Sequence, residues 1–181
     1  MLNALSVSTH SRRRFLGVLT SFAFGLTLAS CQELVTDQYE ATAITTYAWQ
    51  AEYRPQGVSP DRPRDTRIET FETNSLVNTN GQPTVDPTGE RDSQGIWWPA
   101  LPPKPTVEEL EARQKAGEVY SEPLLQKQIE YSLTFDNAGS MVTLPTDATV
   151  YRTAVKASEE ARPLKLLLGA QDGFVQKAEV Q

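Results

Sequence analysis

The chain has 181 residues, of which 39% are hydrophobic and 22% are charged, and its formal net charge is −6. This length suits about one domain, and the composition excludes a multi-span membrane protein, a collagen and a coiled coil.

The first 30 residues have the features of a cleaved targeting segment. Three consecutive arginines precede an apolar run over residues 15–28, and no acidic residue occurs before position 31. The run is short for a membrane-spanning helix, which needs about 20 apolar residues. A basic stretch followed by a short apolar one is typical of a signal peptide.

Two motifs in this segment resemble bacterial export and lipidation signals. The first resembles the twin-arginine motif and contains Arg12, Arg13, Phe15 and Leu16. The second resembles a lipobox and consists of Leu28, Ala29, Ser30 and Cys31. The segment is therefore similar to that of a bacterial lipoprotein precursor. An uncleaved N-terminal anchor, or a Sec signal with an incidental arginine pair, are the alternatives.

The resemblance implies a sequence of processing steps. The twin-arginine (Tat) translocase would export the chain, and the lipoprotein-processing enzymes would attach fatty acyl chains such as palmitate to Cys31 and cleave before it. Two or three chains, at about 0.8 kcal/mol per buried methylene, hold a protein stably on a membrane. We therefore expect a membrane-anchored protein on the extracytoplasmic side, in the periplasm or a lumen. The inner, the outer and an internal photosynthetic membrane all remain open.

Removal of the signal excludes several functions. The mature chain keeps 14 Lys and Arg against 23 Asp and Glu, a net charge of −9, which disfavours nucleic acid as a partner. His10 is lost and Cys31 is blocked by lipid, so His- or Cys-based catalysis and metal ligation are excluded. We expect no enzyme activity, no cofactor and no metal. Asp86, Glu90 and Asp92 could offer oxygens to a hard cation, but solvated turn carboxylates are the simpler interpretation.

The first part of the mature chain combines one clear strand with an irregular segment. Residues 31–38 are expected to be a lipidated tether, and 39–181 a single β-rich domain. Alternation of aromatic and β-branched residues predicts a strand over 42–53, with Tyr47, Trp49 and Tyr53 on one face. Residues 54–105 hold nine of the twelve prolines, so they predict a long excursion or a partly disordered segment, with a short strand possible over 66–73.

The second part is richer in predicted elements. Thr106 and Glu109 form a capping box, which predicts a helix to about residue 116 with Gly117 as its cap. Alternation predicts a strand over 125–135, and a turn at 136–139 predicts its return over 141–144. Further strands are expected over 150–157, although 154–161 could be helical, over the apolar run 164–168, and over 174–180 after a hairpin signal. The expected fold is mainly β, with α+β as the alternative: a small antiparallel sheet, barrel or sandwich with one short helix and a Pro-rich excursion.

Trp97 and Trp98 stand out before the Pro-rich stretch 99–105. They could form an exposed platform for a glycan or an anchor for a partner protein, or they could belong to a strap that plugs the open end of the sheet. We expect a non-enzymatic accessory, assembly or interaction role for a membrane-protein complex. A lipoprotein that binds a glycan or another small ligand on exposed aromatic residues is the alternative.

Overall fold

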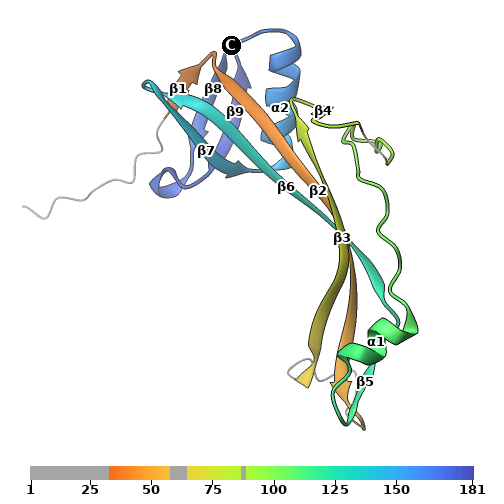
Figure 1. Ribbon diagram of the computed structural model, residues 1–181. Coiled ribbons are helices and arrows are strands. Elements are labelled where there is room, and N and C mark those ends of the chain that lie inside the picture. The colour runs from red at the N-terminus through yellow and green to blue at the C-terminus, as the bar shows by residue number, and fades with distance from the viewer. Residues whose placement is uncertain (1–32, 58–64, 87–88) are drawn as a thin grey trace, which may run out of the picture.

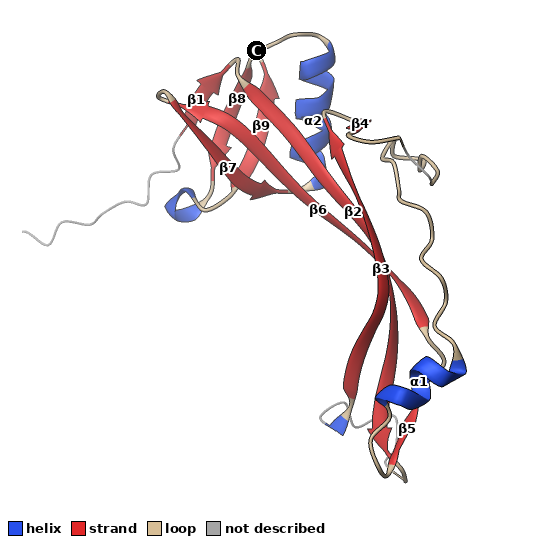
Figure 2. Cartoon of the chain, viewed as in Figure 1, coloured by secondary structure: helices blue, strands red, loops and turns tan. Residues whose placement is uncertain are grey.

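The structure, a computed structural model, describes residues 33–57, 65–86 and 89–181. The signal motifs and Cys31 lie outside the described residues. Strands dominate the described chain and form two antiparallel sheets, accompanied by two α-helices (Figures 1 and 2). The mainly β class is therefore confirmed.

The larger sheet has six strands and contains a long, curved arm. Its strand order is β4 (Gln82–Pro83), β3 (Arg67–Thr79), β2 (Tyr39–Pro55), β6 (Leu124–Asn137) and β7 (Ser140–Thr146), with β5 (Glu118–Tyr120) paired to the far end of β2. We call β3, β5, α1 (Val107–Arg113) and the parts of β2 and β6 near them the arm (Figure 1). The strands expected over 42–53, 66–73, 125–135 and 141–144 all occur here, with longer bounds.

The smaller sheet consists of β1 (Glu33–Thr36), β8 (Leu164–Leu168) and β9 (Val175–Val180). Residues 33–36 were expected to belong to a tether, but Glu33 to Thr36 pair antiparallel with β8 from Leu167 back to Leu164. The smaller sheet is separate from the larger one, because β8 pairs with β1 on one side and with β9 on the other, and none of the three pairs with β7.

The strand expected over 150–157 is instead the helix α2 (Ala148–Glu159). The Asp147 carboxylate accepts hydrogen bonds from the backbone N–H groups of Thr149 and Val150, at 2.8 and 2.9 Å, which satisfies donors that a helix start leaves free. The buried residues Val150, Tyr151, Ala154 and Ala157 recur at helical spacing. The local alternation of β-branched residues was therefore misleading.

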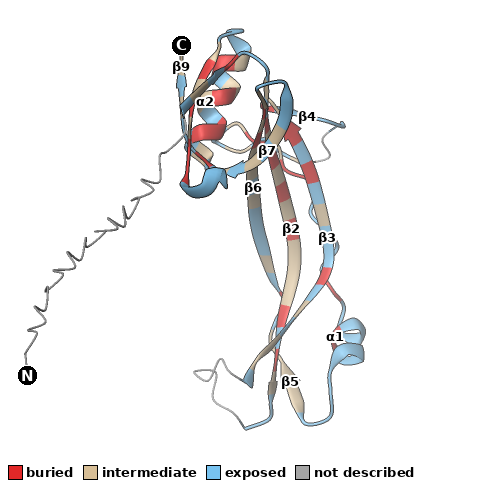
Figure 3. Cartoon of the chain, turned by 90° about the vertical axis from the view of Figure 1, so that its left-hand side faces the viewer, coloured by how far each residue is buried: buried red, intermediate tan, exposed pale blue. Residues whose placement is uncertain are grey.

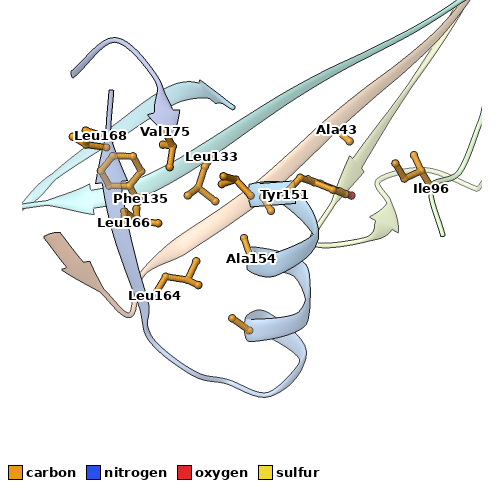
Figure 4. Close-up of a cluster of buried hydrophobic side chains, with 13 residues drawn as sticks. Ala43, Ile96, Leu133, Phe135, Tyr151, Ala154, Leu164, Leu166, Leu168 and Val175 are labelled. Carbon is orange, nitrogen blue, oxygen red and sulfur yellow. The ribbon is translucent and has the colours of Figure 1, made fainter. Parts of the chain in front are cut away.

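The main core lies between α2, the smaller sheet and the adjoining parts of β2 and β6, which together we call the head (Figure 4). A second, smaller cluster lies at the far end of the arm and comprises Ala51, Tyr53, Phe71 and Leu110. Figure 3 shows buried positions recurring along β2 between the two clusters. The arm is therefore continuous with the head through its strands and has a small core of its own.

The helix α1 begins with the predicted capping box. Glu109 N–H donates to Thr106 Oγ1 at 3.3 Å, and Thr106 N–H donates to Glu109 Oε2 at 2.7 Å. The helix ends earlier than expected, at Arg113, so Gly117 does not cap it. Gly117 instead has a φ of +79° in the turn that leads into β5.

The Pro-rich segment, residues 54–105, forms a long excursion wherever the structure describes it. It contains β3 and β4, and residues 89–106 then run along the sheet from the head to α1 (Figure 1). We call residues 89–106 the strap. In the part of the chain that the structure describes, no helix is both long and apolar enough to cross a membrane.

Candidate interaction site

The strap covers the aromatic face of β2, and Trp98 is the residue that covers it most closely. The Trp98 ring is only 8% exposed and lies 4.8 Å from the Tyr47 ring. Its Nε1–H donates to Asp92 Oδ2 at 3.0 Å, and Lys127 Nζ lies 5.5 Å from the ring centre. Trp98 is therefore a buried packing residue and not an exposed platform.

Trp97 fixes the strap through its backbone. Its N–H donates to Asn78 Oδ1 at 3.0 Å, and its carbonyl accepts from Asn78 Nδ2 at 3.0 Å and from Thr45 Oγ1 at 2.9 Å. Both Asn78 and Thr45 are fully buried. Asn78 of β3 and Thr45 of β2 thus hold one residue of the strap over the face of the sheet, and not at its open end.

Two further residues of the aromatic face take part in the same packing. Trp49 Nε1–H donates to the Pro102 carbonyl at 2.9 Å, and the Tyr53 hydroxyl donates to the Leu110 carbonyl at 2.8 Å. With Tyr47, these side chains line the interface between β2, the strap and α1. They serve packing, which leaves little aromatic surface for a ligand.

The candidate cation ligands do not form a site. Asp92 Oδ1 accepts from the N–H groups of Gln94 and Ile96, at 2.8 and 3.0 Å. Burial by itself raises the pKa of Asp92, but these bonds and the one from Trp98 outweigh it, and the pKa lies below its ordinary value. Among the described residues no three His, Cys, Asp or Glu side chains gather as metal ligands would.

An open strand edge is the most distinctive surface feature of the arm. The strand β6 pairs with β2 over its whole described length up to Phe135, but β7 pairs only from Tyr131 onward. Residues Leu124–Glu130 of β6 thus have a partner strand on one side only; we call them the β6 edge. Such an edge is a template for a further strand.

The direction of the free backbone groups follows from the hydrogen-bond alternation in antiparallel pairs. Asp136 N–H donates to the Gln38 carbonyl at 2.9 Å, on the β2 side. The register between β2 and β6 has no shift, so even-numbered residues of β6 face β2. The N–H and C=O groups of Leu125, Lys127 and Ile129 therefore point outward. No described residue forms a hydrogen bond with them.

A hollow of about 540 Å³ adjoins the edge at the point where β7 leaves β6. Ile44, Ile129, Tyr131 and Pro145 give it apolar walls, and Glu130 and Thr143 contribute polar ones. In strand addition the main chain supplies affinity, and pockets beside the edge supply specificity. The hollow is placed to receive a side chain of an added strand.

The opposite edge of the sheet, on β3, is partly occupied. The Val77 carbonyl accepts from the Thr84 N–H at 3.0 Å, and the Thr70 carbonyl accepts from Arg113 at 2.6 Å. Arg67 is tied to Glu118 at 2.7 Å and also pairs with Glu69. These contacts make β3 a poorer template than β6.

The sequence predicted the strand of this edge but not its exposure. The sequence did contain a signal for an open edge, because the expected return strand over 141–144 is much shorter than its expected partner over 125–135. Comparison of the chain with models of protein families, with curated proteins and with solved structures finds no match.

Proposed function

We propose that this protein is a membrane-tethered, extracytoplasmic lipoprotein with a non-enzymatic accessory role, and that a strand of a membrane-complex subunit binds along its β6 edge. The observation that carries the proposal is the run of seven residues, Leu124–Glu130, which pair with β2 on one side and have no described strand on the other, beside a largely apolar hollow. An edge of this length can pair with an extended segment through main-chain hydrogen bonds.

The membrane part of the proposal rests on the N-terminal motifs. The resemblance of residues 11–31 to a twin-arginine signal and a lipobox supports export and acylation of Cys31. A partner in or on the same membrane would meet the anchored protein at high effective concentration. This favours a subunit of a membrane-protein complex over a soluble partner.

The edge also carries a feature that limits indiscriminate pairing. Lys127 lies at its centre, 5.2 Å from the Tyr47 ring and 5.5 Å from the Trp98 ring. A central lysine is a common device against edge-to-edge aggregation. Two copies paired along the whole edge would place Lys127 opposite Lys127, and their like charges would repel. A heterologous strand with an acidic residue at that position fits better.

The alternative of glycan binding is not favoured for the aromatic rings of β2 and for Trp98, because these rings are engaged in packing and hydrogen bonds. Trp98 and Tyr47 face each other beneath the strap, and Trp49 and Tyr53 donate to strap and helix carbonyls. A sugar would need an open aromatic face of the kind that these contacts occupy.

Native affinity purification from mild detergent tests the proposal, using the full chain with a C-terminal tag. The Lys127→Pro variant removes one outward N–H, and proline is tolerated at an edge position of this kind. Lys127→Thr is the matched control, because it removes the charge and keeps the N–H. We expect a stoichiometric membrane subunit to co-purify with the wild type and with Lys127→Thr and to be lost with Lys127→Pro.

Melting curves of both variants control for folding. A lipoprotein that is always alone in the extract would refute the accessory role. A partner that stays bound to a folded Lys127→Pro variant would refute the edge as its site.

A further inference from the structure

The smaller sheet places one exposed turn beside the point where the described chain begins. Glu33, at the start of β1, pairs with Leu167 of β8. Two residues later, Gly169 begins the turn that leads through Ala170–Asp172 and Phe174 into β9. The turn therefore lies at the same end of the smaller sheet as the start of β1 (Figure 1).

The lipidation site cannot lie far from this turn. Cys31 precedes Glu33 by two residues, and an extended chain spans at most about 3.6 Å per residue, so the two Cα atoms are at most about 7 Å apart. Glu33 is itself fixed, since β1 is paired along its length with β8. Of the eight residues expected to form a tether, four belong to β1, and only residues 31 and 32 precede that strand. Acyl chains on Cys31 would therefore hold this end of the head at the membrane.

The turn has the chemistry of an interfacial contact. Phe174 is 42% exposed, and its ring lies over Gly169, where an added Cβ would come within 2.2 Å of the ring. Gly169 N–H donates to the Phe174 carbonyl at 2.9 Å, and Asp172 N–H donates to the Gly169 carbonyl at 3.1 Å. The turn is therefore fixed by its own hydrogen bonds and holds an aromatic ring at the surface. Aromatic side chains are enriched where a protein meets the headgroup region of a bilayer.

The charges near the turn indicate which lipid it suits. Lys165 pairs with Glu33 at 2.8 Å and Lys177 pairs with Glu179 at 2.6 Å, so these four groups largely neutralise one another. Asp172 in the turn, and Asp147, which lines a hollow together with Phe174, form no ion pair among the described residues. The local charge is thus weakly negative, which disfavours an anionic bilayer.

We propose that the turn Ala170–Phe174 rests on a zwitterionic bilayer surface, with the Phe174 ring in the headgroup region. This inference rests on the acylation of Cys31 in the proposed function. Anchored at two points, the acyl chains and Phe174, the head would keep a fixed orientation on the membrane. The β6 edge would then be presented at a constant height, where a membrane-complex subunit could reach it.

Fluorescence in proteoliposomes tests the contact. The purified acylated protein, reconstituted into phosphatidylcholine vesicles, carries an environment-sensitive thiol label at Gln171→Cys in the turn, or at Gln56→Cys at the far end of the arm. Acylated Cys31 has no free thiol, so each variant labels at one position. We expect a blue-shifted emission that lipid-borne quenchers suppress for most of its intensity at position 171, and an aqueous, unquenched emission at position 56.

A Phe174→Ala substitution in the Gln171→Cys background separates the ring from the anchor. We expect the quenching to weaken while the protein still floats with the vesicles, and Phe174→Trp to retain it. An aqueous signal at position 171 in floating protein would overturn the inference and leave the proposed function intact. Loss of flotation by the wild type would overturn both the acylation and this contact. Partner binding is read separately, by co-purification.

Discussion

Asn78 is the side chain through which the sheet holds the strap. It is fully buried, accepts from the Trp97 N–H and donates to the Trp97 carbonyl, both at 3.0 Å. Asn78→Ala would leave the Trp97 N–H without its partner and the Trp97 carbonyl with the Thr45 hydroxyl alone. We therefore expect a loss of about 2–3 kcal/mol in the free energy of unfolding. Urea denaturation measures this loss.

Asn74→Ala is the matched control, because Asn74 makes a single strap contact, to the Ala100 carbonyl at 3.0 Å. We expect it to cost about 1 kcal/mol or less. Equal losses for the two variants would contradict the role given to Asn78.

Asp92 makes the strap sensitive to acid. Its pKa is lowered in the folded state, where hydrogen bonds from Trp98, Ile96 and Gln94 outweigh burial. The ionised Asp92 carboxylate therefore stabilises the folded state at any pH above its unfolded-state pKa, which is about 3.9. This stabilisation is lost as the pH falls from about 3.9 through the folded-state pKa. We expect the wild type to lose more unfolding free energy between pH 7 and this acidic range than Asp92→Asn does. Parallel pH profiles of the two proteins would contradict the assignment.

At the scale of single elements, the stability of α2 depends on Asp147, the residue that caps its N-terminus. The Asp147 carboxylate accepts from two N–H groups of the first turn. Asp147→Ala should lower the free energy of unfolding by about 1 kcal/mol, as measured by thermal melting. Asp147→Asn keeps an oxygen acceptor and should lose less. An unchanged melting curve for the alanine variant would contradict this capping role.

The elements that sequence reasoning predicted correctly are those with one buried and one exposed face. Alternation in β2 and β6 was visible because Ala41, Ala43, Leu133 and Phe135 are buried while their neighbours are not. The strand β1 was missed because four residues are too few for a pattern, and Val35 is 64% exposed. The helix α2 was expected only as an alternative over 154–161, because Thr149, Val150 and Thr153 also suit a strand.

The candidate site was harder to predict than the fold. The β6 edge depends on where β7 leaves β6, and that depends on the start of α2 at Ala148. Burial of the tryptophans likewise depends on contacts between the strap and β3, some 20 residues apart in sequence. Local periodicity carries no information on such pairings.

At the scale of the whole molecule, stability is unevenly distributed. The head core contains 13 buried residues, whereas the cluster at the end of the arm contains four. Local opening costs less where fewer apolar contacts must break. We therefore expect amide hydrogens of β2 in residues 51–54 to exchange faster than those in 41–45, as measured by hydrogen exchange. Uniform protection along β2 would contradict this difference.

A small core at the tip of the arm is compatible with binding. The strands that carry the β6 edge join the stable head at one end and the small cluster at the other. A partner strand paired along Leu124–Glu130 would add hydrogen bonds to the part of the sheet that has only one neighbour for β6. Binding would therefore stabilise the arm.

Site-specific photo-crosslinking in intact membranes tests the central claim most directly. A photoreactive residue at Lys127 would lie in the middle of the β6 edge, and one at Lys177, which is exposed on β9, would serve as the control. We predict one discrete adduct with a membrane-complex subunit from position 127 and none from position 177. No adduct at position 127, the same adducts at both positions, or only a dimer of this chain would contradict the claim.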